Sequence, residues 1–437
     1  MPRCLFILIL LAPSVANAEN WPHWRGPNFN GSTTETGLAT QWSRTEGIEW
    51  SAALPGPSAA TPIIYDRHVF VASAEPTSNR LLAGCYNAST GKLMWEHVVF
   101  NGDVFRDTRS TFASCSPVTN GDLVVFFYGN GEMAGYGLDG HPLWQRNIGK
   151  DYGQFAFMWT FASSPLFYGD RIYLQVLQRD VPVGGRGHAD RPNESYLLTI
   201  DPANGETIWK VERDCQANAE SRESYASPVV LKINGREQLI IAGGDDVSGH
   251  DPADGAELWR WGTWNPSRID HWRFVPTPVA VQDTVLVCAP KKSPVFAVRP
   301  NGDGDLPDDA VLWTSEDDPT LTSDVPSPGV YDGDFFILSD VRKSLARVDP
   351  TTGQIKWSAE TPGAAKYEAS PLVADGKVYV LNFVGDVVIF DAASGAQINV
   401  ISMAEPADDP IRSSIAAANG RLFIRTNDRL YCIAPAS

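Results

Sequence analysis

Two stretches, Asp349-Pro350-Thr351-Thr352-Gly353-Gln354-Ile355-Lys356-Trp357 and Ser370-Pro371-Leu372, decide the fold because copies of both recur along the chain. In the first stretch, the Asp side chain closes a turn, Gly supplies the positive φ that the turn needs, and Trp stands on the strand that follows. The same spacing occurs at Asn87 to Trp95, Asp201 to Trp209 and Asp251 to Trp259. Asp139 to Trp144 is a shortened copy, Asn301 to Trp313 is a lengthened one, and Asp391 to Gly395 has Asn399 in place of Trp.

The second stretch, Ser or Thr followed by Pro and an apolar residue, marks the start of each repeat. Its copies are Thr61-Pro62-Ile63, Ser116-Pro117-Val118, Ser164-Pro165-Leu166, Ser227-Pro228-Val229, Thr277-Pro278-Val279, Ser327-Pro328-Gly329 and Ser370-Pro371-Leu372, and an eighth, Ser414-Ile415-Ala416, lacks the proline. A turn and a β-rich run follow, such as Gly121-Asp122 before LVVFFY. This order predicts a β-hairpin in each repeat.

Each repeat therefore indicates four antiparallel strands, and the chain is predicted to be an all-β, eight-bladed β-propeller. One Trp in each blade is expected to pack between neighbouring sheets: Trp50, Trp95, Trp144, Trp209, Trp259, Trp313 and Trp357. The eighth repeat ends near Ala434 without an outer strand, while Gly47 to Trp50 has the pattern of an outer strand without a blade. We expect the N-terminal strand to complete the last blade, because this pairing removes an open sheet edge.

The N-terminus has the pattern of a signal peptide over residues 1–18, with Arg3, an apolar run and Ala16-Asn17-Ala18. The predicted organisation is this signal peptide, an N-terminal extension over 19–46 and the propeller over 47–437. Glu19 stands at the expected cleavage point, so no acyl anchor is predicted, and no stretch reaches the roughly 20 apolar residues of a transmembrane helix. The mature protein is expected to be periplasmic or secreted.

The net charge limits the classes of partner, and the cysteine content limits the kinds of metal or haem site. The net charge of −17 argues against nucleic acid, whose binding needs clustered Lys and Arg. Five cysteines follow the predicted cleavage point, without a CxxC or CxxCH motif: Cys85, Cys115, Cys215, Cys288 and Cys432. Buried free thiols are expected for most of them, and whether Cys85 and Cys432 lie close enough to bond stays open. No metal site is predicted, because the Asn301 to Asp305 loop has Leu312 where a calcium loop needs Glu.

The Asp-x-x-x-Gly-x-x-x-Trp corners and Ser-Pro inner strands resemble the pyrroloquinoline-quinone-like (PQQ-like) repeats of bacterial propellers, a family that includes quinoprotein dehydrogenases and the outer-membrane protein assembly factor BamB. The opening Trp21 to Pro27, Thr36-Gly37-Leu38 and the expanded corner Arg299 to Asp305 look like an uncharacterised secreted branch of it. For members that bind the quinone, the resemblance implies a disulfide between adjacent cysteines, a calcium site and a Trp floor. This chain has no adjacent cysteines, and only Trp159 could stand for the floor. No cofactor is therefore predicted, and PQQ with calcium belongs to the alternative function.

The propeller topology places the longest connections on one face, over 97–113, 145–160, 178–195, 212–225, 260–275 and 314–325. Any binding surface is expected there, around the mouth of the central channel. The residues expected to ring the mouth precede the inner strands: Arg109, Trp159, Arg222, Glu223, His271, Arg273, Asp324, Lys366, Glu368 and Arg412. Such a ring would suit an anionic, planar ligand. The favoured interpretation is a solvated ring whose charges neutralise one another, because charged positions on surface loops are common with or without a ligand.

A second group of candidates is aromatic. Trp261, Trp264 and Trp272 cluster before the fifth blade, where exposed rings would suit a protein or carbohydrate partner. Burial in a small satellite core is the equally open interpretation. No hydrolase or phosphate-loop motif is present. The leading hypothesis is a non-catalytic scaffold of the cell envelope that recognises a protein partner, in an oligomeric state that the sequence leaves unknown. The alternatives are a PQQ-dependent dehydrogenase with a reduced site and a glycan or small-ligand binding protein.

Overall fold

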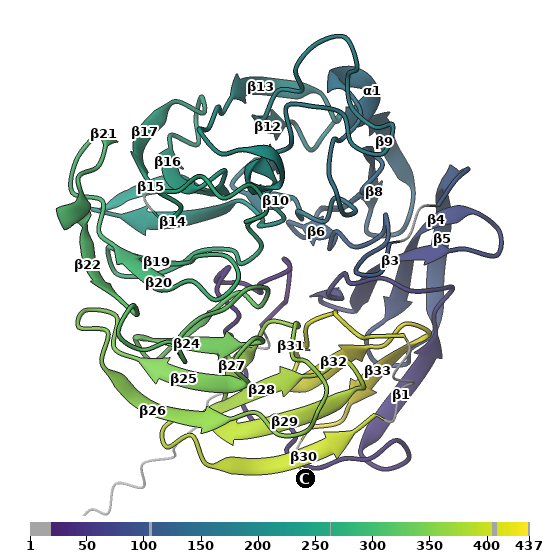
Figure 1. Ribbon diagram of the computed structural model, residues 1–437. Coiled ribbons are helices and arrows are strands. Elements are labelled where there is room, and N and C mark those ends of the chain that lie inside the picture. Colours follow the sequence, from purple (N-terminus) through teal and green to yellow (C-terminus); the bar gives the residue numbers. More distant parts are fainter. Residues whose placement is uncertain (1–18, 105–106, 263, 404–408, 436–437) are drawn as a thin grey trace, which may run out of the picture.

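Eight antiparallel sheets surround a central axis and confirm the predicted all-β propeller (Figure 1). The computed structural model describes residues 19–104, 107–262, 264–403 and 409–435. The predicted signal peptide, residues 1–18, lies outside the described residues. Within the described part, no helix is long and apolar enough to cross a membrane.

In blades 1 to 7 the inner strand comes first in the chain and the outer strand last, whereas blade 8 takes its outer strand from the N-terminus. Blade 1 consists of β2 (Ile63–Tyr65), β3 (His68–Glu75), β4 (Arg80–Asn87) and β5 (Leu93–Asn101), and blade 2 of β6 (Val118–Thr119), β7 (Leu123–Phe127), β8 (Glu132–Gly137) and β9 (Pro142–Asn147). Blade 3 consists of β10 (Leu166–Tyr168), β11 (Arg171–Val176), β12 (Tyr196–Ile200) and β13 (Thr207–Glu212), and blade 4 of β14 (Val229–Ile233), β15 (Arg236–Gly243), β16 (Asp246–His250) and β17 (Glu257–Trp261).

Blade 5 consists of β18 (Val279–Val281), β19 (Thr284–Cys288), β20 (Val295–Val298) and β22 (Val311–Thr314), and blade 6 of β23 (Gly329–Tyr331), β24 (Asp334–Ser339), β25 (Ser344–Val348) and β26 (Ile355–Glu360). Blade 7 consists of β27 (Leu372–Ala374), β28 (Lys377–Leu381), β29 (Asp386–Asp391) and β30 (Gln397–Ser402), and blade 8 of β31 (Ala416–Ala418), β32 (Arg421–Arg425), β33 (Arg429–Ile433) and β1 (Ile48–Ala53). The helices are short: α1 (Ile148–Tyr152), η1 (Ala219–Arg222) and η2 (Asp308–Ala310). In the lengthened corner of blade 5, β21 (Gly304–Asp305) pairs in parallel with the outer strand of blade 4.

The N-terminal strand completes blade 8, as the sequence predicts. Strand β1 pairs antiparallel with β33, so that Trp50 lies opposite Cys432 and Ala53 lies opposite Arg429. The largest cluster of buried apolar residues runs across this seam and joins blade 8 to blades 1, 2 and 7. The two ends of the chain are thus held in one sheet and in one core.

A closed circle of hydrogen bonds joins the inner strands of all eight blades. The backbone N–H of each Ser or Thr in the Ser/Thr-Pro motif donates to the hydroxyl of its counterpart in the next blade, with N to O distances of 2.8 to 3.3 Å. We call these residues the hydroxyl ring: Thr61, Ser116, Ser164, Ser227, Thr277, Ser327, Ser370 and Ser414. Ser414 has lost its proline and keeps its place in the circle.

The corner Trp residues lie between blades, as predicted. The indole N–H donates to a backbone carbonyl at the corner of the next blade at 2.7 to 3.0 Å for Trp50, Trp95, Trp144, Trp313 and Trp357. The corner Gly contacts the same ring; a Cβ on Gly91, whose φ is +67°, would lie 2.4 Å from Trp50. Trp259 instead donates to Gln238, and Trp209 has no hydrogen-bond partner among the described residues.

The N-terminal extension, residues 19–46, closes one end of the channel. The propeller has two faces. One carries the turns between first and second strands and the Asx-Gly corners, and we call it the turn face. The other connections form the loop face. The backbone of the extension contacts four inner strands, through Trp21 with Ile64, Pro22 with Thr119, Asn30 with Val330 and Ser32 with Val373. Figure 1 shows this purple segment at the centre of the propeller. Asn399, where the corner Trp is missing, donates to the Thr40 carbonyl at 2.8 Å.

The hydroxyl ring predicts a measurable cost for losing one member. Ser327 is fully buried and accepts the N–H of Thr277 at 2.8 Å. We expect Ser327→Ala to lower the free energy of unfolding by about 1–3 kcal/mol, because it leaves a buried N–H without a partner. Thermal and denaturant unfolding measure this loss. Ser89→Ala, at an exposed corner, is the control and should stay within about 0.5 kcal/mol of wild type; equal stability of both variants would contradict a structural role for the ring.

Candidate functional site

A cavity of about 160 Å³ lies at the centre of the loop face. Trp24 of the extension and members of the hydroxyl ring line it, so it ends within the channel. Three guanidinium groups and one carboxylate also line it, together with two aromatic side chains: Arg109, Arg273, Arg412, Glu368, Trp159 and Tyr225. The cavity thus combines cations, hydroxyl groups and aromatic faces.

One wall is built around Trp159. The Arg109 guanidinium lies 5.0 Å from the Trp159 ring, and the Trp159 backbone N–H donates to the Tyr225 hydroxyl at 3.2 Å. Tyr225 donates in turn to Glu223 at 2.6 Å. Burial raises the pKa of Glu223, although Arg179 pairs with it. Glu223 therefore supports the wall from behind and does not line the cavity.

The opposite wall is built on Glu368. Its carboxylate lies 3.1 Å from the Arg412 guanidinium and 3.8 Å from that of Arg109. Arg273 is buried and pairs with Asp324 at 3.3 Å. These pairs hold the arginine side chains in place, which lowers the conformational entropy that a ligand would otherwise have to remove.

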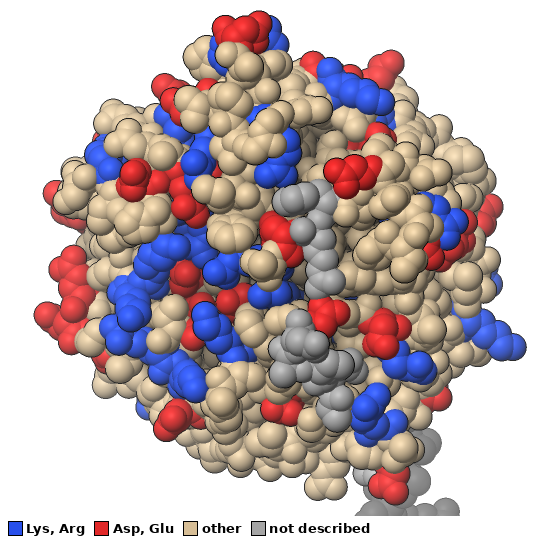
Figure 2. All heavy atoms as spheres, turned by 45° about the vertical axis from the view of Figure 1, so that its right-hand side comes forward, with Lys and Arg blue, Asp and Glu red and all other residues tan. Residues whose placement is uncertain are grey.

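Further cations gather on the same side of the mouth. Burial, together with the guanidinium groups of Arg273 and Arg109, lowers the pKa of Lys291, and Asp324 opposes this effect. Lys292, Arg342 and Lys343 lie on connections of the loop face in blades 5 and 6. Figure 2 shows Lys and Arg gathered on the left of the loop face, with Asp and Glu scattered among and around them. An acidic protein thus has a cationic region at the mouth.

The structure brings five of the ten predicted mouth residues to the cavity: Arg109, Trp159, Arg273, Glu368 and Arg412. Glu223 and Asp324 lie one layer behind them. His271 and Lys366 are exposed and do not line the cavity. Tyr225, Trp24 and the ring hydroxyls line it and were not among the candidates. The Ser/Thr-Pro motif was the available signal for the hydroxyls, because its residues stand at equivalent positions in every blade.

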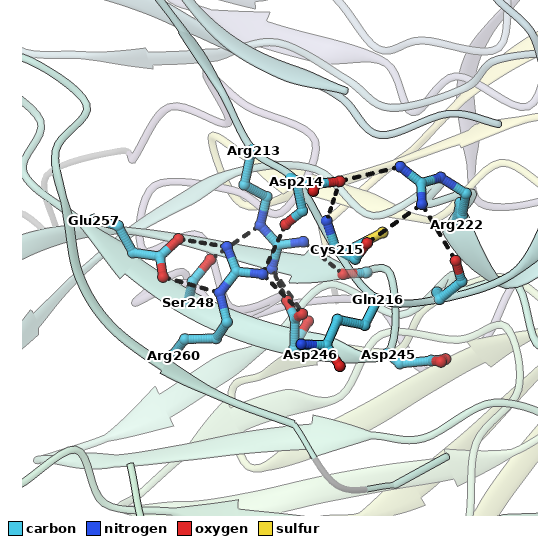
Figure 3. Close-up of polar contacts among 12 residues, drawn as sticks. Arg213, Asp214, Cys215, Gln216, Arg222, Asp245, Asp246, Ser248, Glu257 and Arg260 are labelled. Atoms are coloured by element: carbon cyan, nitrogen blue, oxygen red, sulfur yellow. Dashed lines mark hydrogen bonds and ion pairs between the residues drawn. The ribbon is translucent and has the colours of Figure 1, made fainter. Parts of the chain in front are cut away.

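Arg222 does not line the cavity and joins a polar network between blades 3 and 4 (Figure 3). Its guanidinium donates to the Cys215 carbonyl at 3.3 Å and to Asp214 at 3.2 Å. In the same network, Asp246 accepts from both Arg213 and Arg260, and Arg260 also pairs with Glu257. These contacts explain Arg222 as a structural residue.

The interpretation of Trp261 and Trp264 as exposed partner-binding rings is wrong. Their side chains are 2% and 5% exposed and pack with Phe274 and Phe296 between blades 4 and 5. Trp272 is half-buried against the same cluster. A long loop over two blades leaves an apolar gap, and these rings fill it. The satellite core is thus the interpretation that the burial supports.

The residues present do not match the quinone and calcium site that the resemblance implies. All five cysteines in the described part are buried and free. Arg109 covers one face of the Trp159 ring. Among the described residues, no group of three or more His, Cys, Asp or Glu side chains could hold a metal ion. We therefore assign no reaction step to this cavity.

A buried carboxyl behind the mouth predicts a pH effect on stability. Burial, assisted by Asp324 and Glu368, raises the pKa of Asp340 to about 6 from its ordinary 3.8. The folded state therefore holds a proton more tightly than the unfolded state, and stability falls as pH rises from about 4 through 6. We expect Asp340→Asn to raise the free energy of unfolding at pH 8 by about 2–3 kcal/mol, with little change at pH 4. Melting temperatures at both pH values measure it, and Asp303→Asn, at an exposed position, is the control; an equal gain at both values would contradict the assignment.

Comparisons with solved structures agree with the fold. BamB from Moraxella catarrhalis superposes with a TM-score of 0.60 at 14% identity, over 88% of this chain and 98% of that one. Quinohemoprotein alcohol dehydrogenase from Comamonas testosteroni gives 0.63 at 12% identity, over 96% and 81%. A europium-containing methanol dehydrogenase gives 0.67 at 8% identity, over 95% and 98%. At such identities the likeness concerns the fold alone.

Sequence comparison is more specific about the family. The curated proteins contain no match. The family profile described as outer membrane protein assembly factor BamB matches residues 31–176, 156–303 and 302–397, which together are most of the chain. The chain therefore belongs to this BamB-type family of PQQ-like propellers.

Proposed function

We propose that the protein is a non-catalytic scaffold of the cell envelope, which binds a protein partner through the loop face and receives an acidic side chain of that partner in the central cavity. The observation that carries the proposal is the cavity wall, where three guanidinium groups face one carboxylate beside Trp159 and Tyr225. Guanidinium groups bind carboxylates through two parallel hydrogen bonds, and aromatic faces pack against the aliphatic part of a side chain.

The size of the cavity favours part of a larger partner over a whole small molecule. Pockets that enclose drug-sized ligands measure about 300–1,000 Å³, whereas this cavity measures about 160 Å³. A single carboxylate side chain fits such a volume. The remainder of the partner would then lie on the surrounding loops, several of which carry Lys and Arg.

Membership of the BamB-type family and the predicted signal peptide support a location outside the cytoplasm. The first structural relative is named as BamB, and two further relatives are named as dehydrogenases. The dehydrogenase alternative lacks support from the residues of the cavity, and no observation favours a glycan over a carboxylate.

Acidic peptides test the proposal directly. A set of short peptides with a central Asp or Glu, each paired with its Asn or Gln counterpart, would be titrated while tryptophan fluorescence is followed. We expect saturable binding of acidic peptides, binding at least tenfold weaker for the amide counterparts, and a similar loss in Arg109→Gln, because one charge-assisted contact contributes about 1.5–3 kcal/mol. Added salt should also weaken the binding.

Arg67→Gln is the matched control, because Arg67 is an exposed guanidinium on the turn face. Equal binding of acidic and amide peptides, or equal loss in both arginine variants, would remove the cavity from the proposal. Titration with PQQ, with and without calcium, separates the enzyme alternative: tight, calcium-dependent quenching would favour a dehydrogenase over the scaffold.

A further inference from the structure

The closed end of the channel contains a second, smaller cavity of about 20 Å³. Residues of the N-terminal extension form one side and the inner strands of blades 3 to 5 form the other. Its lining includes His23, Arg25, Ser164, Ser227 and Thr277. Trp24 lines both this cavity and the larger one at the mouth, so the two are neighbours along the channel.

Arg25 is a buried cation without an anionic partner in the described part of the chain. Arg25 is only 4% exposed. Its terminal nitrogens donate to the backbone carbonyls of Asn30, Pro328 and Pro371. No ion pair with a carboxylate is found for it among the described residues, and its Nε is buried without an acceptor. Burial lowers the pKa of Arg25 to about 9. Burying an unpaired charge is costly, so a compensating anion is expected nearby.

The other polar groups of the small cavity are donors. The hydroxyls of Ser164, Ser227 and Thr277 each accept a backbone N–H within the hydroxyl ring. Their own protons have no acceptor among the described residues, so they remain available to a ligand. His23 Nδ1 is also buried without a partner. Burial lowers the pKa of His23 to about 3, which keeps the ring neutral and allows Nδ1 to donate in one tautomer.

The volume of the small cavity suits a small ligand. A cavity needs about 10–15 Å³ to hold one water-sized particle, and this one measures about 20 Å³. Water would leave the Arg25 charge uncompensated, whereas an anion would compensate it. We propose that the closed end of the channel binds one small monovalent anion, chloride under ordinary salt conditions, between Arg25 Nε and the hydroxyls of Ser164, Ser227 and Thr277.

This site would connect the extension to the whole inner wall. Arg25 already contacts blades 6 and 7 through carbonyl groups, and the anion would add blades 3 to 5. Anion binding should therefore stabilise the closure of the channel. The inference does not rest on the peptide-binding proposal: Ser164 and Ser227 line both cavities, but Arg25 lines only the small one and Arg109 only the one at the mouth.

Bromide provides a direct test, because it replaces chloride and scatters anomalously. We expect crystals grown in sodium bromide to show one anomalous peak within hydrogen-bond distance of Arg25 Nε. In solution, sodium chloride should raise the melting temperature by about 1–3 °C over sodium gluconate at equal ionic strength, because the ligand binds only the folded state. Arg25→Gln should lose this increase.

Arg109→Gln at the mouth is the matched control and should keep the chloride effect. A chloride effect lost in Arg109→Gln and kept in Arg25→Gln would place the anion at the mouth and overturn the proposal. Absence of an anomalous peak in the small cavity would overturn it as well. If Arg25→Gln does not fold, the crystal experiment on the unaltered protein decides.

Discussion

The closed circle of hydrogen bonds through the hydroxyl ring is the constraint on which the rest of the structure depends. Each blade contributes one backbone N–H and one hydroxyl, and each is used by a different neighbour. The circle closes only if eight inner strands stand at equal height around the axis. A missing member would leave a buried donor without a partner, which costs more than one ordinary hydrogen bond contributes. The repeat that contains Ser414 has lost the proline and retained the hydroxyl, so the circle depends on the hydroxyl and not on the proline.

The outer parts of the blades are held by a second system of contacts. The indole of one blade donates to the corner of the next, and the corner Gly gives the ring its space. Blade 8 has no corner of its own, because its outer strand comes from the N-terminus. The extension fills that gap, since Asn399 donates to Thr40 and the Trp42 ring lies against Met403. Earlier residues of the same segment, Trp21 to Ser32, close the channel, so one stretch of chain supports both the seam and the floor of the cavity.

The central cavity follows from these two systems. The hydroxyl ring sets its width, the extension sets its depth, and the loops supply its charge. Arg273 and Glu368 are held by ion pairs before any ligand arrives. A cationic mouth on a chain of net charge −17 is an uneven distribution of charge, which favours the approach of acidic groups to this face over others.

The sequence by itself determined the number of blades, the order of strands, the place of the corner Trp residues and the closure by β1. These features depend on turn chemistry within a few residues and on a repeated spacing, so local patterns carry them. Tertiary structure alone decided which loop residues meet. Arg222 and Arg273 precede successive inner strands in the same way, yet one joins a network between blades and the other lines the cavity. Trp261 and Trp264 are buried by a neighbouring blade, and Arg25 meets Pro371 from far along the chain. Such contacts arise from the paths of long loops and of the extension, which no local spacing specifies.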